Sequence, residues 1–276
     1  MQHRLPGGQP HGSHDSPRTS DNVIDVRDLT HSFPTPTGYE TEVLTNISMT
    51  VGKGQFVAIV GPSGCGKTTL MNIVAGLEAP QTGNVEVRGT APYSGQAGVG
   101  YLFARDALLP WRTALGNAEF AMELRKVPKQ ERRQRAMAAL NDVGLGAATE
   151  RYRAELSQGM RQRVALARTW AAEPDLILMD EPFSALDAQT KLTLQDKFMR
   201  LWERRSASAL LITHDLAEAI ALADKVLVMT RSPGRVKSIH EIDISRPRSV
   251  LALQQDHRYH KYLELIWSDL RDEVNE

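Results

Sequence analysis

The sequence predicts an α/β protein with a mostly parallel sheet, an antiparallel β edge and a helical insert. In the C-terminal half, short apolar runs at residues 176–179, 209–213 and 226–229 alternate with segments of helical periodicity. This alternation is typical of parallel strands covered by helices on both faces. Before residue 55, short strand-like stretches separated by glycine turns indicate antiparallel pairing. From about residue 106 to residue 172 the texture is helical, which indicates an insert.

Length, charge and cysteine content narrow the class of protein. The 276 residues suffice for one large domain or two small ones. Basic and acidic residues balance at 33 each, so we expect no nucleic-acid partner. Cys65 is the only cysteine, which excludes an intramolecular disulfide and fits a reducing compartment. No apolar run approaches the ~18 residues of a membrane span and no signal peptide is evident, so we expect a cytosolic protein.

The first elements follow an unstructured start. Residues 1–21 are rich in Gly, Pro, His and Ser and predict a disordered tail, whose histidines match no metal-site spacing. Strand signals then run through residues 23–29 and, after a turn-rich insert at 34–38, through residues 43–49. Residues 85–102 alternate strand and turn signals in the same way.

Residues 61–69 read Gly-Pro-Ser-Gly-Cys-Gly-Lys-Thr-Thr and fit the pattern G-x-x-x-x-G-K-[ST]. A buried strand pattern at 55–60 precedes them, and apolar residues at helical spacing follow: Leu70, Ile73, Val74 and Leu77. Strand, glycine loop and helix form the context in which backbone N–H groups and a helix N-terminus converge on phosphate oxygens. The sequence therefore predicts a site for a nucleoside triphosphate, made by Gly61, Pro62, Ser63, Gly64, Cys65, Gly66, Lys67, Thr68 and Thr69.

The side chains of this loop have distinct predicted roles. Lys67 reaches the β- and γ-phosphates, and the Thr68 hydroxyl ligates Mg²⁺. Phe33 or Tyr39 could stack on an adenine ring, because any base offers a π-face; the alternative for each is an aromatic residue in the core.

Three further residues follow apolar strand patterns directly: Asp180, Glu181 and His214. Ligands of open parallel sheets bind beyond the carboxyl ends of the strands, so these side chains are expected beside the phosphate loop. Asp180 suits the Mg²⁺ shell, through water, and Glu181 would orient and polarise the attacking water. His214 would hold the γ-phosphate and that water. The predicted reaction is hydrolysis of ATP with Mg²⁺ as cofactor.

The remaining elements complete the expected chain. Helices are predicted at 114–124 and 129–143 within the insert, at 187–204 and at 216–223. Beyond residue 235, apolar residues between Val236 and Ile244 predict a short hairpin, and a stripe from Tyr259 to Leu270 predicts a helix. The expected organisation is a tail at 1–21, one domain at 22–235 with its insert at about 106–172, and a C-terminal extension at 236–276.

Several motifs in order resemble those of the ATP-binding subunit of an ABC transporter, from about Val23 to the C-terminus. Besides residues 61–69 and His214, they are the signature-like run Leu-Ser-Gln-Gly-Met-Arg-Gln-Arg at 156–163, Asp-Glu-Pro at 180–182 and Ser-Ala-Leu-Asp at 184–187. The resemblance implies a phosphate-loop NTPase core of the ABC ATPase type. It also implies a head-to-tail homodimer, in which the signature of one subunit closes over the γ-phosphate held by the other. Four further nucleotide-site residues follow by resemblance: Ser157, Gln158, Gly159 and Asp187.

By its position in the family, Phe33 is the expected adenine-stacking aromatic residue. At two other positions the sequence departs from the family pattern. Ala104 occupies the position after the strand where the family usually has a glutamine, whose side chain approaches Mg²⁺ and the attacking water. Gln158 stands where the family most often has glycine, with Ser157 and Gly159 intact. We expect Ala104 to affect hydrolysis and coupling more than Gln158.

Residues 107–111, the pair Thr169-Trp170 and residues 232–235 are most similar to the nitrate, sulfonate and taurine importer group. The resemblance implies transmembrane permease subunits as partners, an indirect periplasmic or extracellular solute-binding protein, and a peripheral location on the cytoplasmic face of the inner membrane. Leu108, Leu109 and Trp111 would help form a groove for a permease helix, and ordinary packing of the insert is the alternative.

Three functions remain to be distinguished. The first is an ATPase that energises import of a small solute. The second is a nucleotide-gated regulatory subunit that hydrolyses weakly because of Ala104, although Glu181 and His214 are both present. The third, a soluble ABC protein acting on ribosomes or DNA, requires two tandem domains or a long coiled-coil insert, and the sequence predicts neither.

Overall fold

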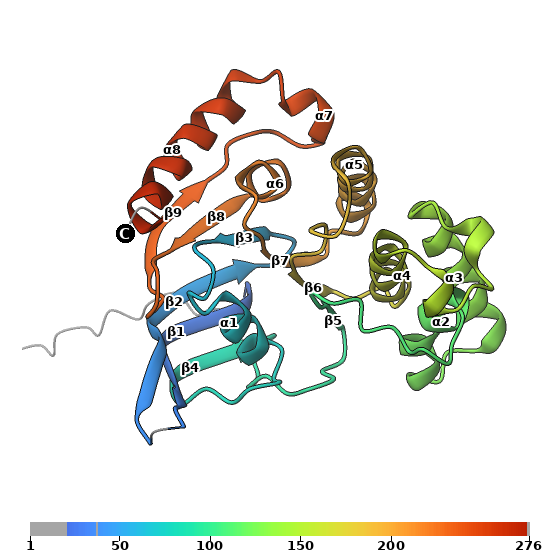
Figure 1. The fold of residues 1–276 in the computed structure, drawn as a ribbon, viewed down its shortest axis with the longest axis horizontal. Coiled ribbons are helices and arrows are strands. Elements are labelled where there is room, and N and C mark those ends of the chain that lie inside the picture. The colour runs from blue at the N-terminus through green and yellow to red at the C-terminus, as the bar shows by residue number, and fades with distance from the viewer. Residues whose placement is uncertain (1–20, 37, 275–276) are drawn as a thin grey trace, which may run out of the picture.

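The computed structural model describes residues 21–36 and 38–274, so the tail expected at 1–21 lies almost wholly outside the described residues. Two sheets organise the chain (Figure 1). The larger one has six strands in the order β5-β6-β7-β3-β8-β9, parallel except for β9. Its strands are β3 (Phe56–Val60), β5 (Val99–Leu102), β6 (Leu176–Asp180), β7 (Ser208–Ile212), β8 (Lys225–Met229) and β9 (Val236–Glu241).

The smaller sheet is antiparallel, with the order β2-β1-β4, as expected from the N-terminal pattern. It consists of β1 (Asn22–Pro34), β2 (Glu40–Gly52) and β4 (Thr82–Val87). The helix α1 (Lys67–Val74) lies between the two sheets (Figure 1). This helix is shorter than its sequence pattern indicated, because Leu77 lies beyond its end and is exposed.

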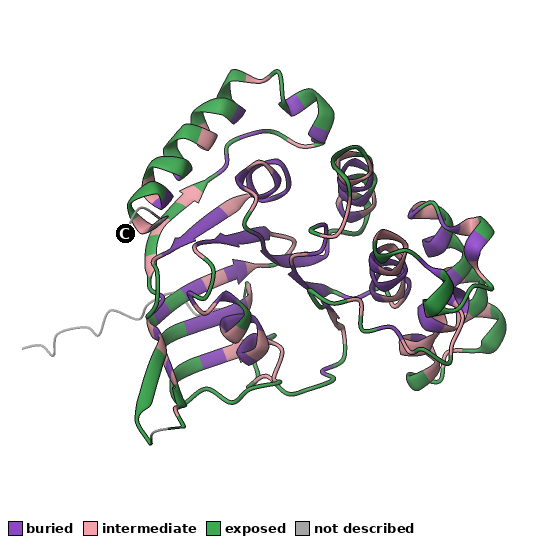
Figure 2. Ribbon diagram, viewed as in Figure 1, coloured by how far each residue is buried: buried purple, intermediate pink, exposed green. Residues whose placement is uncertain are grey.

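The parallel sheet is buried on both faces, which explains why its strands read as unbroken apolar runs. Along β3, Phe56, Ala58 and Val60 enter one core, and Val57 and Ile59 enter the other. The first core is formed with the later helices, and the second with α1 and the antiparallel sheet. Figure 2 shows this arrangement as buried central strands inside helices that are exposed on their outer sides.

The insert extends from the C-terminal end of β5 as a helical lobe (Figure 1). Short 3-10 turns connect its second and third helices. The helices of the lobe are α2 (Ala114–Leu124), α3 (Lys129–Asp142) and α4 (Gln158–Ala171). The helices that follow are α5 (Ala188–Arg205) and α6 (Leu216–Leu222). The helix α4 packs against α2 and α3 in the lobe and also contacts β5, so it joins the lobe to the sheet.

The C-terminal segment differs from the expected local hairpin. The structure has a single strand there, β9, which pairs antiparallel with β8. The chain pairs back onto β8 because that strand is already in place as the edge of the sheet, whereas residues 242–249 contain no strand. Two helices follow, α7 (Val250–Leu253) and α8 (His257–Val274). The predicted apolar stripe of α8 packs in the first core and contacts α6, except for Trp267, which is 53% exposed. No helix in the described ranges is both long and apolar enough to cross a membrane.

Candidate nucleotide site

The phosphate loop turns from the buried end of β3 into α1, as its sequence predicts. Gly66 is the N-cap of α1 and has a φ of 93°, a left-handed value that side chains other than glycine rarely adopt. A Cβ atom at this position would lie 2.6 Å from Cδ2 of Leu44. The glycine is therefore required both by backbone conformation and by the close approach of β2.

The ammonium group of Lys67 is folded over this loop. Its Nζ atom donates hydrogen bonds to the carbonyl oxygens of Gly61 at 2.8 Å and Pro62 at 2.7 Å. The side chain is buried to 8% exposure at the start of α1, so the charge is held at the helix N-terminus, close to the loop amides. Cys65 is fully buried among the apolar residues of the second core and serves packing.

Thr68 and Asp180 meet at the C-terminal end of the parallel sheet. The Thr68 hydroxyl donates to Oδ2 of Asp180 over 3.1 Å. Burial raises the pKa of Asp180, as does the neighbouring Glu181 carboxylate, whereas the Thr68 hydrogen bond and Lys67 lower it; the net direction is upward. A carboxylate and a hydroxyl side by side are the oxygen donors that Mg²⁺ prefers beside substrate phosphates, so the donor set fits this ion.

Glu181 and His214 form a pair beside the loop. The Nδ1 atom of His214 lies 3.2 Å from Oε1 of Glu181, and the imidazole is 65% exposed, so it is accessible from the cavity that it lines. The backbone of Glu181 has a φ of 47°, which is uncommon outside glycine and turns the side chain away from the strand direction. The sequence placed both residues after apolar strands, and the structure brings them together.

One cavity of about 310 Å³ brings together most of the residues predicted for a single subunit. Four predicted residues do not line it: Gly61, Pro62, Cys65 and Asp180. Its walls come from β1, β2, the phosphate loop, β6 and β7. The lining residues are Phe33, Val43, Ser63, Gly64, Gly66, Lys67, Thr68, Thr69, Glu181, Ile212 and His214.

Of the two candidate aromatic residues, only Phe33 lines this cavity. Its ring packs edge-on against His31, with centroids 4.8 Å apart, which holds it in place. Tyr39 is 76% exposed and does not line the cavity.

The signature residues and Asp187 lie outside this cavity in the same chain. Ser157 is the N-cap of α4, where its hydroxyl accepts from the backbone N–H of Met160 at 3.3 Å. Gln158 and Gly159 follow in the first turn; Gln158 is exposed and Gly159 is half-buried. Asp187 is the N-cap of α5 and accepts from the Thr190 N–H at 3.0 Å; this bond lowers the pKa of Asp187.

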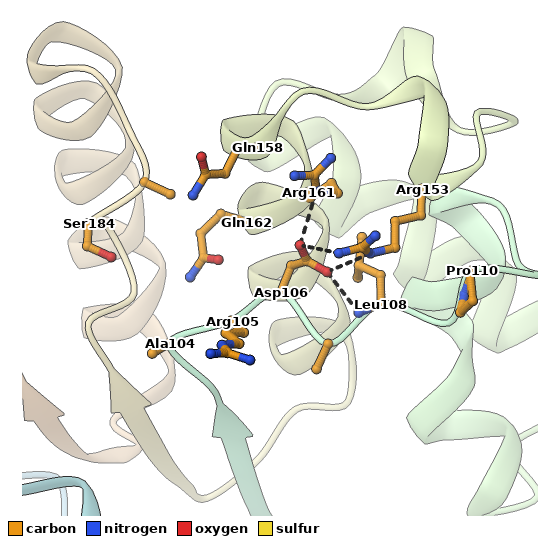
Figure 3. A pocket seen from close by; sticks show the side chains of 12 residues that line it. Ala104, Arg105, Asp106, Leu108, Pro110, Arg153, Gln158, Arg161, Gln162 and Ser184 are labelled. Carbon is orange, nitrogen blue, oxygen red and sulfur yellow. Dashed lines mark hydrogen bonds and ion pairs between the residues drawn. The ribbon is translucent and has the colours of Figure 1, made fainter.

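A second hollow, the arginine groove, lies between the segment after β5, the start of α4 and the turn before α5 (Figure 3). It has a volume of about 530 Å³. Ala104 lines this groove and not the nucleotide cavity. Gln96, at the other end of β5, is buried and donates to the Val87 carbonyl oxygen, so its amide does not replace the missing glutamine. The groove is lined by Ala104, Arg105, Asp106, Ala107, Leu108, Pro110, Arg153, Gln158, Arg161, Gln162, Ser184 and Ala185.

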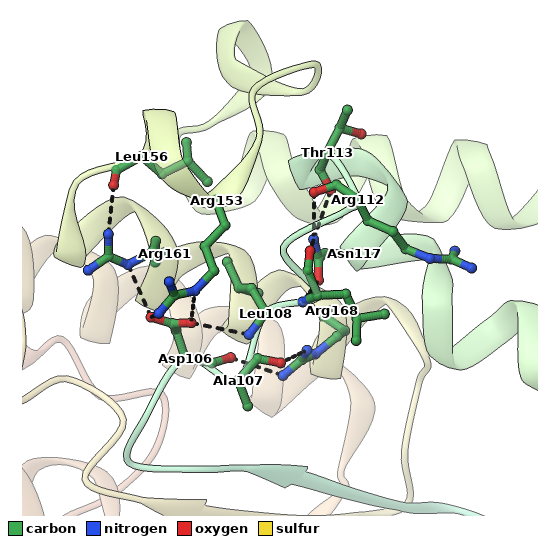
Figure 4. Close-up of polar contacts among 11 residues, drawn as sticks. Asp106, Ala107, Leu108, Arg112, Thr113, Asn117, Arg153, Leu156, Arg161 and Arg168 are labelled. Atoms are coloured by element: carbon green, nitrogen blue, oxygen red, sulfur yellow. Dashed lines mark hydrogen bonds and ion pairs between the residues drawn. The ribbon is translucent and has the colours of Figure 1, made fainter.

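Asp106 organises the inner wall of the arginine groove (Figure 4). Its carboxylate accepts from Arg153 and from Arg161, each at 3.1 Å, and from the backbone N–H of Leu108 at 3.1 Å. Arg168 donates to the carbonyl oxygens of Asp106 and Ala107. Although burial alone raises the pKa of Asp106, the hydrogen bonds from Arg153 and Leu108 prevail and lower it.

Sequence reasoning missed this network, and its expectation for the apolar residues here was partly wrong. Leu108 is only 5% exposed and packs in the first core, so it belongs to the packing alternative. Trp111, by contrast, is 71% exposed, and Leu109 is partly exposed. Asn117 anchors this segment, because its side chain accepts from the Leu109 N–H at 2.8 Å and donates to the Arg112 carbonyl oxygen.

Comparisons with known proteins agree on one family. A family model described as ABC transporter matches residues 44–184. The chain is 41% identical over 251 residues to an uncharacterized ABC transporter ATP-binding protein of Methanocaldococcus jannaschii, covering 91% of this chain and 92% of that protein. It is 40% identical over 224 residues to the taurine import ATP-binding protein TauB of Pseudomonas putida, covering 81% and 84%. It is also 42% identical over 231 residues to the bicarbonate transport ATP-binding protein CmpC of Synechococcus elongatus, covering 82% of this chain but 34% of that longer protein.

Solved structures resemble the fold described above. The dimeric structure of a bacterial ABC transporter cassette superimposes with a TM-score of 0.73 and 27% sequence identity, covering 80% of this chain and 100% of that chain. A dimeric post-hydrolysis state of an ATP-binding cassette, bound to ADP and Pi, gives the same values.

Proposed function

The chain belongs to the ABC transporter family and is an ATPase of that family, and from this premise we propose that it energises the import of a small solute through a membrane permease. The observation that carries the proposal is the single cavity in which the phosphate loop, Glu181 and His214 meet. The names of the relatives, taurine import and bicarbonate transport, favour a sulfonate or bicarbonate type of solute. The sequence resemblance described above adds nitrate.

In the proposed reaction, the phosphate loop binds the triphosphate through its backbone N–H groups and through Lys67. The Lys67 ammonium exchanges its hydrogen bonds to the Gly61 and Pro62 carbonyl oxygens for bonds to phosphate oxygens. Glu181 accepts a proton from the attacking water, and His214, whose Nδ1 faces Glu181, presents its outer edge toward the γ-phosphate. Phe33 stacks on the adenine ring at the edge of the cavity.

Mg²⁺ would be held by Thr68 directly and by Asp180, in the second shell through water. The bound ion would supply positive charge to the β- and γ-phosphate oxygens. The hydrogen bond between Thr68 and Asp180 places both groups for this task before the ion binds.

The complete site requires a second copy of the chain. Ser157, Gln158 and Gly159 lie at the exposed start of α4, away from their own chain's cavity, and Asp187 is exposed at the start of α5. A hydroxyl and free N–H groups at a helix start suit the γ-phosphate held by the other subunit. Dimeric solved relatives support this arrangement.

The arginine groove is the proposed docking site for a cytoplasmic helix of the permease. Arg105 is exposed and has no ion pair among the described residues, while Arg153 and Arg161 share the single carboxylate of Asp106. The lining therefore carries excess positive charge (Figure 3), and Trp111 adds exposed apolar surface to the same segment. A short helix with acidic and apolar residues fits such a surface. The protein would then lie on the cytoplasmic face of the membrane, with a solute-binding protein acting on the far side.

Two measurements test the proposed function. The first is steady-state ATP turnover of the purified protein with Mg²⁺ present and withheld; turnover that requires Mg²⁺ supports it. The second is ATP-dependent uptake of taurine, nitrate and bicarbonate into vesicles that contain the assembled transporter. Tight ATP binding without turnover, even in the assembled transporter, would favour the regulatory subunit instead. The presence of both Glu181 and His214 in the cavity argues against that outcome.

A further inference from the structure

A partly buried ionic cluster joins the first turn of α5 to the start of α6. The Nζ atom of Lys191 lies 2.8 Å from Oδ2 of Asp215 and 2.8 Å from Oε2 of Glu218. The side chain of Glu218 is 2% exposed and that of Lys191 is 19% exposed, so water screens this pair little, whereas Asp215 is 34% exposed and its pair with Lys191 is screened more. None of these three residues lines the nucleotide cavity.

The cluster is braced on both helices. Gln195, one turn beyond Lys191, donates its amide to Oε2 of Glu218 at 3.1 Å. Asp215 is the N-cap of α6 and accepts from the Glu218 N–H at 3.2 Å, while its own N–H donates to the Thr213 hydroxyl. The backbone on either side of His214 is therefore fixed by hydrogen bonds.

Charge keeps the cluster together. Although burial opposes it, the carboxylates of Glu218 and Asp215 raise the pKa of Lys191, which stays protonated. Burial raises the pKa of Glu218, whereas hydrogen bonds from Lys191 and from the α6 backbone lower that of Asp215 in spite of burial. From α8, Tyr259 lies near enough that the Asp215 charge, after burial, contributes to its raised pKa.

The two ends of this connection are functional positions. Asp215 directly follows His214, whose imidazole contacts Glu181 at 3.2 Å. Lys191 lies one helical turn beyond Asp187, the N-cap of α5. A displacement of the start of α5 therefore reaches the start of α6 through one largely buried cation, because a charged hydrogen bond between packed helices resists stretching.

We propose that Lys191 is a positioning residue that couples the Asp187 end of α5 to His214, so that dimer closure at Asp187 places the histidine, already paired with Glu181, against the γ-phosphate. The inference rests on the roles proposed above for His214 and Asp187. Lys191 touches neither the nucleotide nor the water; it acts on the rate through the placement of the imidazole.

The test compares Lys191→Ala, Lys191→Arg and a control, Lys197→Ala, in Mg²⁺-ATP turnover. Lys197 lies on the same helix, is exposed, and has no hydrogen bond or ion pair among the described residues. Misplacing a catalytic group costs between a few-fold and about 100-fold in rate. We expect Lys191→Ala to lower kcat about tenfold with KM for ATP within about twofold. Lys191→Arg should recover most of the rate, and Lys197→Ala should behave as the wild type.

Asp215→Asn guards against simple unfolding. Asparagine caps a helix as well as aspartate does, so this variant keeps the start of α6 and loses only the charge that faces Lys191. It should also lower kcat without raising KM. A KM that rises in parallel with the loss of kcat, or a Lys191→Arg variant as slow as Lys191→Ala, would overturn the positioning role in favour of a structural one.

His214→Ala separates the two levels of the proposal. If that variant loses turnover while Lys191→Ala and Asp215→Asn keep it, the coupling inference is wrong and the proposed site stands. If His214→Ala keeps wild-type turnover, the proposed role of His214 is wrong, and the inference falls with it.

Discussion

The nucleotide cavity and the arginine groove both lie beyond the C-terminal ends of strands in the parallel sheet. Their charged side chains have different roles. In the cavity, the Lys67 ammonium donates to two loop carbonyl oxygens, which phosphate oxygens can replace, and to Sγ of Cys65 at 3.6 Å. In the groove, Asp106 already accepts from two guanidinium groups and a backbone N–H. The Lys67 ammonium can exchange its hydrogen-bond partners for phosphate oxygens, whereas the Asp106 carboxylate holds Arg153 and Arg161 in place and so stabilises the lobe. Substitutions in the two regions should therefore change different quantities.

The largest effect is expected for Glu181→Gln in the cavity. Glutamine keeps the shape of the side chain but cannot accept the proton from the attacking water, so kcat should fall by about 10²–10⁴-fold. ATP binding should stay within a few-fold of the wild type, since the phosphates are held by the loop. Steady-state turnover and equilibrium nucleotide binding measure the two quantities.

Glu78→Gln provides a matched control for this substitution, because Glu78 is exposed and lies beyond the end of α1, outside the cavity. Wild-type turnover in the Glu181→Gln variant would show that the Glu181 carboxylate has no role in the reaction. Its place in the cavity would then concern nucleotide binding only.

Lys67→Ala should affect binding more than any other substitution in the loop. Charge-assisted hydrogen bonds to phosphate contribute about 1.5–3 kcal/mol each, which corresponds to a loss of ATP affinity of about 10- to 100-fold. A fluorescent ATP analogue titrated against the variant measures the change. Lys53→Ala, at the opposite edge of the sheet, should bind as the wild type. Equal affinities for the Lys67→Ala and wild-type proteins would contradict an exchangeable lysine.

In the groove, Asp106→Asn should lower stability and leave nucleotide affinity unchanged. The variant loses charge-assisted hydrogen bonds from Arg153 and Arg161 at a largely buried position, at a cost of about 2 kcal/mol in the free energy of unfolding. Denaturant unfolding of both proteins gives this difference.

The same pair of proteins predicts a pH dependence with a definite sign. The folded pKa of Asp106 is lowered, so its contribution is complete above the ordinary value of about 4 and is lost as the pH falls through the folded pKa. The stability difference between wild type and Asp106→Asn should therefore be constant near neutrality and shrink below about pH 4. A difference that persists unchanged at about pH 3, below the ordinary carboxyl pKa, would mean that the carboxylate charge does not carry the effect.

The contrast between the two regions also explains what the sequence could predict. The phosphate loop is contiguous, and each residue from Gly61 to Thr69 has its place set by its neighbours, so the pattern was sufficient. The core strands were equally predictable from the sequence, because burial on both faces gives unbroken apolar runs. Asp180, Glu181 and His214 needed only the rule that strand ends of a parallel sheet share one edge.

The arginine groove could not be predicted from the sequence in this way. Asp106 meets Arg153, Arg161 and Arg168, which lie 47 to 62 residues further along the chain, and nothing local distinguishes these arginines from a solvated helix face. Leu108 and Trp111 are three residues apart in one apolar segment, yet only the packing of the lobe decides that the first is buried and the second exposed. The prediction that β9 pairs with the residues that follow it was wrong for the same reason. Its partner is the preceding strand β8, and the local pattern does not show which neighbour the strand pairs with.

Ala104 lies on the boundary between the two regions, and Ala104→Gln should have the smallest effect. In this structure Ala104 lines the groove, so a glutamine there gains a contact with the water or metal shell only when the lobe moves toward the nucleotide cavity. One neutral hydrogen bond formed in that closed state contributes about 1 kcal/mol, or about a fivefold increase in kcat. The increase should appear in the transporter assembled with its permease and be smaller in the isolated protein if the proposed docking in the groove positions the lobe. Turnover that is unchanged in both preparations would show that water replaces the amide here without loss, and the boundary residue would then belong to the groove alone.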